Sequence, residues 1–245
     1  VTDPEERRRL LSDPGFRARF AKQWSNPFAA KAWHRDLGEP RIVGCPDASL
    51  VGRTFAEVAA ERGVEPLECF LDLQVEFGDD LRWYTVVGND RTRELEFVVS
   101  HPAVLMGFSD AGAHLRNMAY YDFPLHLLRL VLRAEAEGRT LMPRERAVHR
   151  LTGELADYLG IDAGHLEVGR RADIAVVDPD ALDDRLDEIT EDEMVGMPDL
   201  HRLVRRHDAC VPAVLVNGRV AWHDGAFADG FGDRPGYGRV LRATA

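Results

Sequence analysis

Residues 104–108 read Val-Leu-Met-Gly-Phe, a near-continuous run of apolar side chains. Such runs are typical of strands buried on both faces, as in parallel sheets flanked by helices. A similar run at 41–45 ends before Pro46. Helical patterns alternate with these runs up to about residue 160, which indicates parallel β/α units. Only two or three such strands are visible, whereas a closed (β/α)₈ barrel needs eight, so this chain cannot build one alone.

The remaining elements follow from caps, prolines and periodicity. Aspartate–proline pairs at 3–4 and 13–14 predict two helix starts. A helix with Phe55, Val58 and Ala59 on one face is expected to end at Gly63, and another is expected to start at Glu65-Pro66 and to end near Gly78. Residues 93–100 are expected to form a short helix or a turn. Helices are also expected at 123–137 and 143–159, and strands at 83–87 and 172–177. Asn217-Gly218 predicts a type I′ hairpin over 211–223 that lies in one β layer with 172–177. Residues 179–208 are acidic and are expected to be irregular.

Composition excludes several classes of partner. The chain has 42 acidic and 31 basic residues, a net charge of -11, which argues against nucleic acid or an anionic membrane. No apolar run approaches the roughly 20 residues of a membrane helix. The three cysteines form no CxxC pair, which suits a reducing, cytoplasmic compartment. The chain starts at Val1 and opens no signal peptide, so we expect further sequence upstream.

An aspartate follows the most buried of the predicted strands. Residues 108–114 read Phe-Ser-Asp-Ala-Gly-Ala-His, which places Asp110 at the carboxyl end of the strand run and ahead of a glycine turn. We expect 41–45 and 104–109 to be neighbouring parallel strands, with Asp110 at their C-terminal edge, where α/β enzymes keep catalytic groups. The alternative is that Asp110 only caps the next turn.

Two later stretches strengthen the catalytic interpretation. Residues 151–161 contain Leu-Thr-Gly-Glu-Leu-Ala and Leu-Gly-Ile, and residues 164–178 contain Gly-x-Leu-x-x-Gly-x-x-Ala-Asp-Ile and a valine run. Together they resemble the passage by which amidohydrolase-superfamily enzymes leave their barrel and enter a small β domain. His101-Pro102, the 109–114 loop and the tail from Val216-Asn217-Gly218 onward are most similar to the N-acyl-D-amino-acid deacylase branch.

The resemblance implies an α/β fold. Residues 1–168 would form the C-terminal part of a (β/α)₈ TIM-type barrel, and residues 169–245 part of a small β-sandwich domain. The family holds one or two divalent metals, usually zinc, at the barrel mouth. The ligands include a His-x-His, a middle-strand acid, cysteine or carboxylated lysine, two further histidines and an aspartate of the eighth strand. Only the aspartate, Asp110, matches here, so we expect the N-terminal half of the same polypeptide as a partner and no stoichiometric zinc in the isolated chain.

The resemblance also suggests roles for individual residues. Asp110 would be both metal ligand and general base, since a carboxylate can take a proton from water and pass it to the leaving amine. His114 and Arg116 stand where relatives have a His-Pro-Arg whose arginine meets the substrate carboxylate. Arg116 as a solvated loop residue is an equal alternative. Asn89 either faces the mouth or forms a turn, and Cys45 is expected to be a buried free thiol.

These observations predict a metal-dependent hydrolase of linear amides, acting on C–N bonds other than peptide bonds, with a small N-acyl amino acid or related amide as substrate. Metal-activated water would be the nucleophile. Two alternatives stay open. One is a cyclic-amide hydrolase of the same superfamily, since the barrel-exit motif is shared. The other is a non-catalytic fragment that binds a partner through open strand edges. The isolated chain is expected to be inactive.

Overall fold

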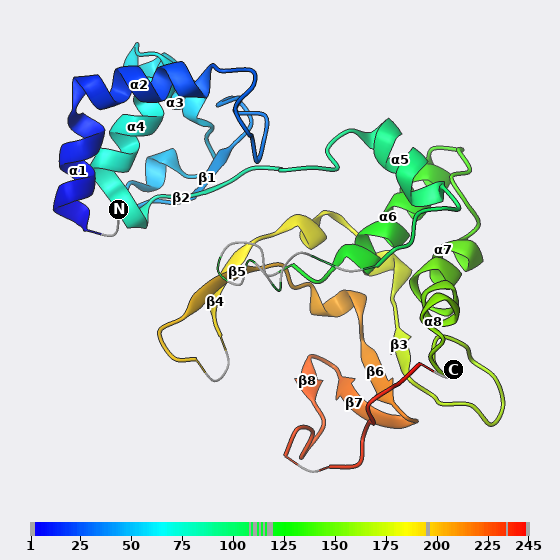
Figure 1. Cartoon of the computed structure of the whole chain (residues 1–245). Helices are drawn as coiled ribbons and strands as arrows, with labels where there is room; N and C mark the ends of the chain where they lie inside the picture. The colour runs from blue at the N-terminus through cyan, green and yellow to red at the C-terminus, as the bar shows by residue number, and fades with distance from the viewer. Residues whose placement is uncertain are drawn as a thin grey trace. The chain divides into compact units, whose positions relative to one another are not determined.

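The computed structural model describes residues 3–107, 109, 112, 114, 116, 120–194, 197–233 and 235–243. The chain divides into two compact units, Val1–Leu95 and Glu96–Ala245, whose elements are labelled in Figure 1. The boundary that we predicted between a barrel part and a small β domain at residues 168 and 169 stays a prediction. Among the described helices, none combines the length and the apolar character that a bilayer crossing needs.

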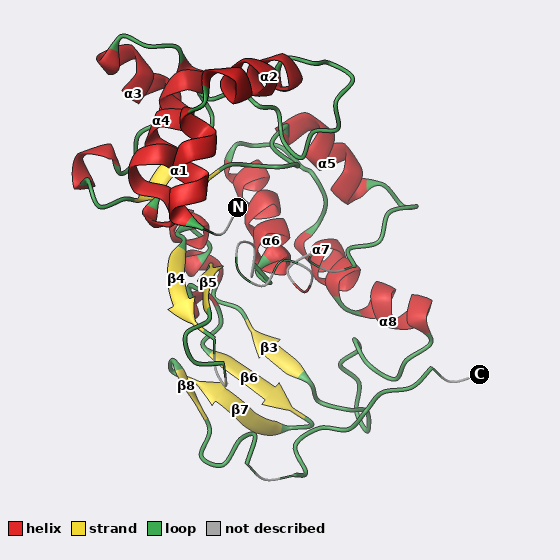
Figure 2. Cartoon of the chain, turned by 60° about the vertical axis from the view of Figure 1, so that its left-hand side comes forward, coloured by secondary structure: helices red, strands yellow, loops and turns green. Residues whose placement is uncertain are grey.

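The first unit is mainly helical (Figure 2). Its elements are α1 (Pro4–Ser12), α2 (Pro14–Trp24), β1 (Arg41–Gly44), η1 (Ala48–Leu50), α3 (Phe55–Arg62), α4 (Pro66–Phe77), η2 (Gly78–Asp80) and β2 (Arg82–Tyr84), and α5 (Thr92–Ser100) spans the boundary between the units. The first two helices begin as predicted. Asp3 accepts hydrogen bonds from the backbone N–H groups of Glu5 and Glu6 at 2.8 and 2.9 Å, and Asp13 accepts one from Phe16 at 2.6 Å.

An aromatic cluster forms the core of this unit. Phe55 is fully buried, and its ring lies edge to face with that of Phe70 at a centroid distance of 5.0 Å. Trp83 of β2 lies 6.0 Å from Phe55, and Trp24 of α2 lies 6.0 Å from Phe70. Edge-to-face aromatic pairs stabilise a core beyond the area they bury. The cluster therefore joins α2, α3, α4 and β2 into one unit.

The strand at 41–44 has a different partner from the one that we predicted. β1 pairs with β2 in antiparallel orientation, with Ile42 opposite Trp83. Residues 104–107 form no strand. The predicted parallel pairing of 41–45 with 104–109 is therefore wrong. Ile42 is fully buried in the core of its own unit, so the apolar run reflects local burial rather than a parallel sheet.

A buried arginine explains why the segment before residue 105 needs no neighbouring strand. Arg150 on α7 (Arg144–Leu151) is 1% exposed, and its guanidinium donates to the backbone carbonyls of His101, at 3.1 Å, and Val104. Its Nε lies 3.4 Å from the Glu154 carboxylate. Buried carbonyl groups need hydrogen-bond partners, and here a side chain supplies them in place of a strand.

The second unit combines helices with antiparallel sheets (Figures 1 and 2). Besides α7 it contains α6 (Phe123–Ala136), α8 (Gly153–Leu159), β3 (Ile174–Val176), η4 (Pro179–Ala181), η5 (Asp184–Asp187), β4 (Thr190–Glu193), β5 (His201–Val204), η6 (Asp208–Cys210), β6 (Ala213–Val216), β7 (Arg219–His223) and β8 (Ala226–Phe227). One sheet has the strand order β3-β6-β7-β8, and β4 and β5 form another.

The predicted hairpin is confirmed. β6 and β7 pair antiparallel through Asn217 and Gly218, whose φ angles are 51° and 76°. Positive φ at both central residues is what a type I′ turn requires. β3 pairs with β6, so the strand predicted at 172–177 and the hairpin share one sheet, as expected.

Two features of this unit differ from the sequence prediction. The acidic stretch expected to be irregular contains the β4–β5 hairpin, with Glu191 opposite Leu203. The helix predicted over 143–159 is interrupted at Thr152, where φ is -131° and ψ is -92°. Gly153 follows this break and approaches the rings of His149 and His165 too closely for a side chain. Because of this break, α7 and α8 are two separate helices and need not share one axis.

A second buried arginine fixes α6 to η5. Arg129 is 7% exposed and donates to both carboxylate oxygens of Asp187 at 2.9 Å and to the Asp183 carbonyl at 2.8 Å. One ring nitrogen of His126 lies 3.0 Å from the same guanidinium, and the other lies 2.8 Å from Asp122. Burial alone would raise the pKa of Asp187, but hydrogen bonding to Arg129 and its charge outweigh burial and lower this pKa.

The aromatic core generates the first prediction. Phe55→Ala should lower the free energy of unfolding by about 3–5 kcal/mol, because it removes a fully buried ring that contacts two other aromatic residues. Chemical denaturation followed by circular dichroism measures the change. Phe28→Ala is the matched control, since Phe28 is 95% exposed, and it should change the value by no more than about 0.5 kcal/mol. Equal effects of the two substitutions would contradict the assigned core.

Asp187→Asn tests the Arg129 cluster through its pH dependence. At pH 7 it should cost about 1–2 kcal/mol, in the lower part of the range for charged hydrogen bonds because Asp187 is half-exposed. The folded pKa lies below the ordinary value of 3.8, so the carboxylate stabilises the fold above 3.8. That stabilisation is lost as pH falls through the folded pKa.

Denaturation of both proteins at pH 7 and at successively lower pH provides the measurement. The difference between them should shrink toward zero in acid. Asp184→Asn is the control, because the Asp184 carboxylate is 89% exposed, and it should have little effect at any pH. A difference between wild type and Asp187→Asn that did not change with pH would argue against the role of the ionised carboxylate.

Candidate functional site

The loop between residues 109 and 120 contains most of the predicted site residues. Asp110, predicted as metal ligand and general base, lies outside the described residues. His114 and Arg116 are described, and both are exposed. Exposure leaves their side chains accessible to a small solute. The roles that we predicted for all three residues stay predictions.

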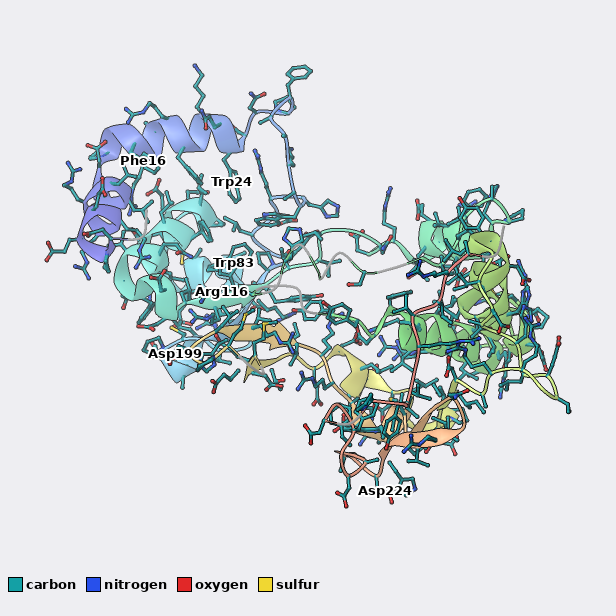
Figure 3. All side chains as sticks on the ribbon, turned by 60° about the horizontal axis from the view of Figure 1, so that its bottom comes forward. Phe16, Trp24, Trp83, Arg116, Asp199 and Asp224 are labelled. Atoms are coloured by element: carbon teal, nitrogen blue, oxygen red, sulfur yellow. The ribbon has the colours of Figure 1, made fainter. Side chains whose placement is uncertain are left out.

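Contacts at both ends of this loop fasten it to the second unit. The Ser109 hydroxyl donates to the Tyr120 carbonyl and so closes the loop. The guanidinium of Arg205 lies 4.4 Å from the centroid of the Tyr120 ring, a cation–π contact. The backbone N–H of Leu203 on β5 donates to the Arg116 carbonyl at 2.8 Å. Figure 3 shows Arg116 beside the β4–β5 hairpin. Arg116 and Tyr120 are thus held by β5 and by the residues after it.

Asn89 belongs to the first unit, whereas the 109–120 loop belongs to the second. Asn89 is exposed and has a φ angle of 62°, a left-handed conformation that asparagine tolerates better than most residues. This geometry favours the turn-forming alternative that we considered for Asn89.

The motif at 151–178 has a clear physical basis. Gly164 has a φ angle of 76°, and a Cβ built on it would lie 2.7 Å from the backbone carbonyl carbon and oxygen of Thr152. Only glycine permits such an approach at this φ. Next to it, Nε2 of His165 lies 2.8 Å from the carboxylate of Asp157 on α8, which accepts its hydrogen bond. The chain leaving α8 is therefore packed directly against the break between the two helices.

The two halves of the motif region meet at the hairpin turn. The Asp173 carboxylate accepts a hydrogen bond from the Asn217 backbone N–H at 2.7 Å, and the Ala172 carbonyl accepts one from Gly218 at 2.8 Å. The Ala-Asp pair and the Asn-Gly pair were both part of the family resemblance. Their contact shows why these residue types occur together. The aspartate fixes the turn of the hairpin that pairs with its own strand.

The described residues do not by themselves form a metal site. Among them, no group of three or more histidine, cysteine, aspartate or glutamate side chains is close enough to hold a metal ion. The cysteines are free. Burial raises the pKa of the Cys69 and Cys210 thiols, which favours the neutral form over a metal-binding thiolate. Cys45 is a free thiol, as predicted, although it is only partly buried.

Sequence reasoning missed the residues that hold the loop. Tyr120 and Arg205 lie far apart in the chain, and Arg205 lies in the stretch that we expected to be irregular. The succession of basic residues at 201–207, His-Arg-Leu-Val-Arg-Arg-His, in an acidic chain was the available signal. A cation–π pair has no fixed spacing, so the signal does not identify the partner.

No family model matches the chain. The chain is 44% identical over 249 residues to uncharacterized proteins of Mycobacterium bovis and Mycobacterium tuberculosis. The alignment covers 99% of this chain, and the chain spans 41% of the length of these curated relatives.

Solved structures with a similar fold come from D-aminoacylases. One, determined in work on the binuclear metal center of D-aminoacylase, has 24% identity and a TM-score of 0.47, and the match covers 86% of this chain and 40% of that one. An N-acyl-D-glutamate deacylase of Bordetella bronchiseptica, complexed with zinc and a phosphonate inhibitor, has 24% identity and a TM-score of 0.47. That match covers 85% of this chain and 38% of the other. The sequence motifs resemble the same family.

The glycines of the motif provide a test with an internal control. Gly164→Ala should lower the free energy of unfolding by about 2–5 kcal/mol, because strain at positive φ adds to a clash with the Thr152 backbone. Gly169 has a φ angle of 88°, but nothing lies within 4 Å of an added Cβ, so Gly169→Ala should lower the free energy of unfolding by only about 1–2 kcal/mol. Thermal and chemical denaturation of both variants measure the difference. Equal costs would contradict the close approach at Gly164.

Proposed function

We propose that this chain is the C-terminal part of a metal-dependent hydrolase of linear amides, of the N-acyl-D-amino-acid deacylase type. The contact between Ala172-Asp173 and Asn217-Gly218 is the main support, because it explains physically why two separate motifs of that family occur in one chain. The contacts of the described residues Ser109, Arg116 and Tyr120 are the second support. In such a site the Ser-Asp-Ala-Gly-Ala-His sequence at 109–114 favours deacylation of linear amides over hydrolysis of cyclic ones.

The proposed complete fold is a (β/α)₈ barrel with a small β-sandwich domain. Residues 1–168 would contribute the end of the barrel and residues 169–245 part of the small domain. The N-terminal half of the polypeptide would supply the missing strands. We propose a cytoplasmic enzyme, since its cysteines are free thiols.

The chemistry proposed for this chain centres on proton transfer and substrate orientation. Asp110 would accept a proton from the attacking water and return it to the leaving nitrogen, since the amine is a poor leaving group until it is protonated. Arg116 would bind the substrate carboxylate through two parallel hydrogen bonds, which its planar guanidinium favours. Its exposure suits contact with a substrate that arrives from solvent. His114 would help to position the acyl amide.

The proposed cofactor is one or two divalent metal ions, zinc in the first instance. Such an ion makes water a strong nucleophile near neutral pH. A zinc site needs at least three protein ligands, and the described residues do not provide them together. The other ligands would come from the N-terminal half. The isolated chain is therefore expected to hold no tightly bound zinc and to be inactive.

Substitutions in the complete polypeptide test this assignment. Asp110→Asn keeps the size of the side chain but removes the base, so kcat for an N-acyl-D-amino acid should fall by about 10²–10⁴-fold. Arg116→Ala should raise KM for that substrate and leave KM for its uncharged C-terminal amide unchanged. Steady-state kinetics on the two substrates measures both effects.

Two exposed residues outside the loop are the controls. Asp184→Asn and Arg91→Ala alter side chains that are 89% and 72% exposed, and neither should change kcat or KM. Near-normal kcat in Asp110→Asn would mean that Asp110 only forms a turn, and it would contradict the catalytic role proposed for the loop. Faster turnover of cyclic amides than of N-acyl amino acids by the unmodified protein would favour the cyclic-amide alternative.

A further inference from the structure

A pocket of about 430 Å³ lies within the second unit and is lined in part by residues of β6, β7 and β8. One part of its lining is apolar and comes from the sheet and the residues after it. These apolar residues are Val214, Val216, Ala221, Trp222, Phe227 and Phe231. Trp222 and Phe227 meet edge to face at 5.0 Å, and Phe227 stacks on Phe231 at 5.5 Å. The volume lies within the range of pockets that bind small molecules.

Another part of the lining is basic, although the whole chain is acidic. Arg202, Arg205, Arg206 and His207, all on β5 or just after it, line the pocket. Arg206 is 2.9 Å from the Asp192 carboxylate, and Arg205 contacts the Tyr120 ring. These two side chains therefore have protein partners. Arg202 and His207 differ from them.

Nε of Arg202 and Nε2 of His207, both in this basic part, are each buried and have no hydrogen-bond partner among the described residues. The His207 side chain is 11% exposed, and its Nε2 lies 3.9 Å from Asp183, beyond hydrogen-bond distance. A buried donor without an acceptor is costly, so such atoms in a pocket wall indicate where a ligand acceptor binds.

Two carboxylates also line the pocket, Asp122 and Asp208. Asp122 is occupied by His126 at 2.8 Å, and Asp208 is exposed. Neither compensates Nε of Arg202. The positive groups therefore determine the charge that the pocket accepts, and the aromatic wall determines what is attached to that charge.

We propose that this pocket binds a monocarboxylate with an apolar tail. The carboxylate would accept hydrogen bonds from Nε of Arg202 and from a protonated Nε2 of His207. The tail would lie against Trp222, Phe227 and Phe231. Charge-assisted hydrogen bonds and burial of the tail act together, so neither half of the ligand should bind well alone. The proposal does not depend on the function of the 109–120 loop.

Calorimetric titration of the 245-residue chain with sodium octanoate tests the proposal. We expect saturable binding of one octanoate per chain. Octanamide lacks the charge and acetate lacks the tail, so each should bind at least about tenfold more weakly. Quenching or enhancement of tryptophan fluorescence should accompany octanoate binding and should be absent in Trp222→Phe. This comparison locates the ligand, because the three other tryptophans lie in the first unit.

Variants of the basic wall complete the test. Arg202→Met keeps a long side chain and removes the guanidinium, and it should weaken octanoate binding at least about tenfold. Arg185→Met, at an exposed arginine that does not line the pocket, is the matched control and should bind octanoate normally. His207→Gln provides a second variant if Arg202→Met proves unstable, and it should weaken binding in the same direction.

Three results would overturn the proposal. These are the absence of saturable octanoate binding to the folded chain, equal affinity for octanoate and octanamide, and unchanged affinity in both Arg202→Met and His207→Gln. None of these results bears on Asp110, so failure here leaves the proposed hydrolase untouched. Loss of activity in Asp110→Asn concerns only the hydrolase, and the octanoate titration alone decides whether the pocket binds a carboxylate.

Discussion

The buried guanidinium of Arg150 joins the segment before residue 105 to the helices of the second unit. A buried charge is costly unless it is paired, and here two backbone carbonyls accept hydrogen bonds from the guanidinium while a carboxylate lies 3.4 Å from its Nε as an ion-pair partner. The carbonyls belong to His101 and Val104, just before the 109–120 loop, and the carboxylate belongs to Glu154 on α8. One side chain thus sets the position of the loop entry relative to the helices. Removing it would deprive the His101 and Val104 carbonyls of this donor, whereas Glu154 would keep its ion pair with Arg146.

Elements governed by local chemistry could be predicted from the sequence. Aspartate caps with proline in the first turn define the starts of α1 and α2, and Gly63 ends α3 in a left-handed conformation. The Asn217-Gly218 turn defines its hairpin in the same way. The partner of β1 could not be predicted, because it is chosen by burial between segments far apart in the sequence. An apolar run such as 41–44 specifies that it is buried, not which strand lies beside it.

The candidate site likewise contains features that local chemistry determines and features that depend on distant parts of the chain. The loop sequence and the glycine-rich passage indicate a family, since each residue type there meets a local steric or hydrogen-bonding demand, as Gly164 does against Thr152. The residues that hold the loop were not predictable. Tyr120 and Arg205 are 85 positions apart in the sequence, and their contact depends on the β4–β5 hairpin. The sequence of β4 is mostly acidic, so this hairpin could not be recognised from an alternation of apolar and polar residues. A strand with charged residues on both faces lacks the apolar–polar alternation by which a strand is predicted.

The turn that joins β6 to β7 also bears on the chemical ageing of the protein. Asparagine followed by glycine loses ammonia when the glycine backbone nitrogen attacks the asparagine side-chain amide and closes a five-membered ring. In this chain the Gly218 nitrogen donates its proton to the Ala172 carbonyl at 2.8 Å, and the Asn217 nitrogen is held by Asp173. Both bonds keep the turn in a left-handed geometry and the nucleophilic nitrogen engaged. The contact that joins the two motifs therefore also protects the dipeptide most prone to spontaneous deamidation.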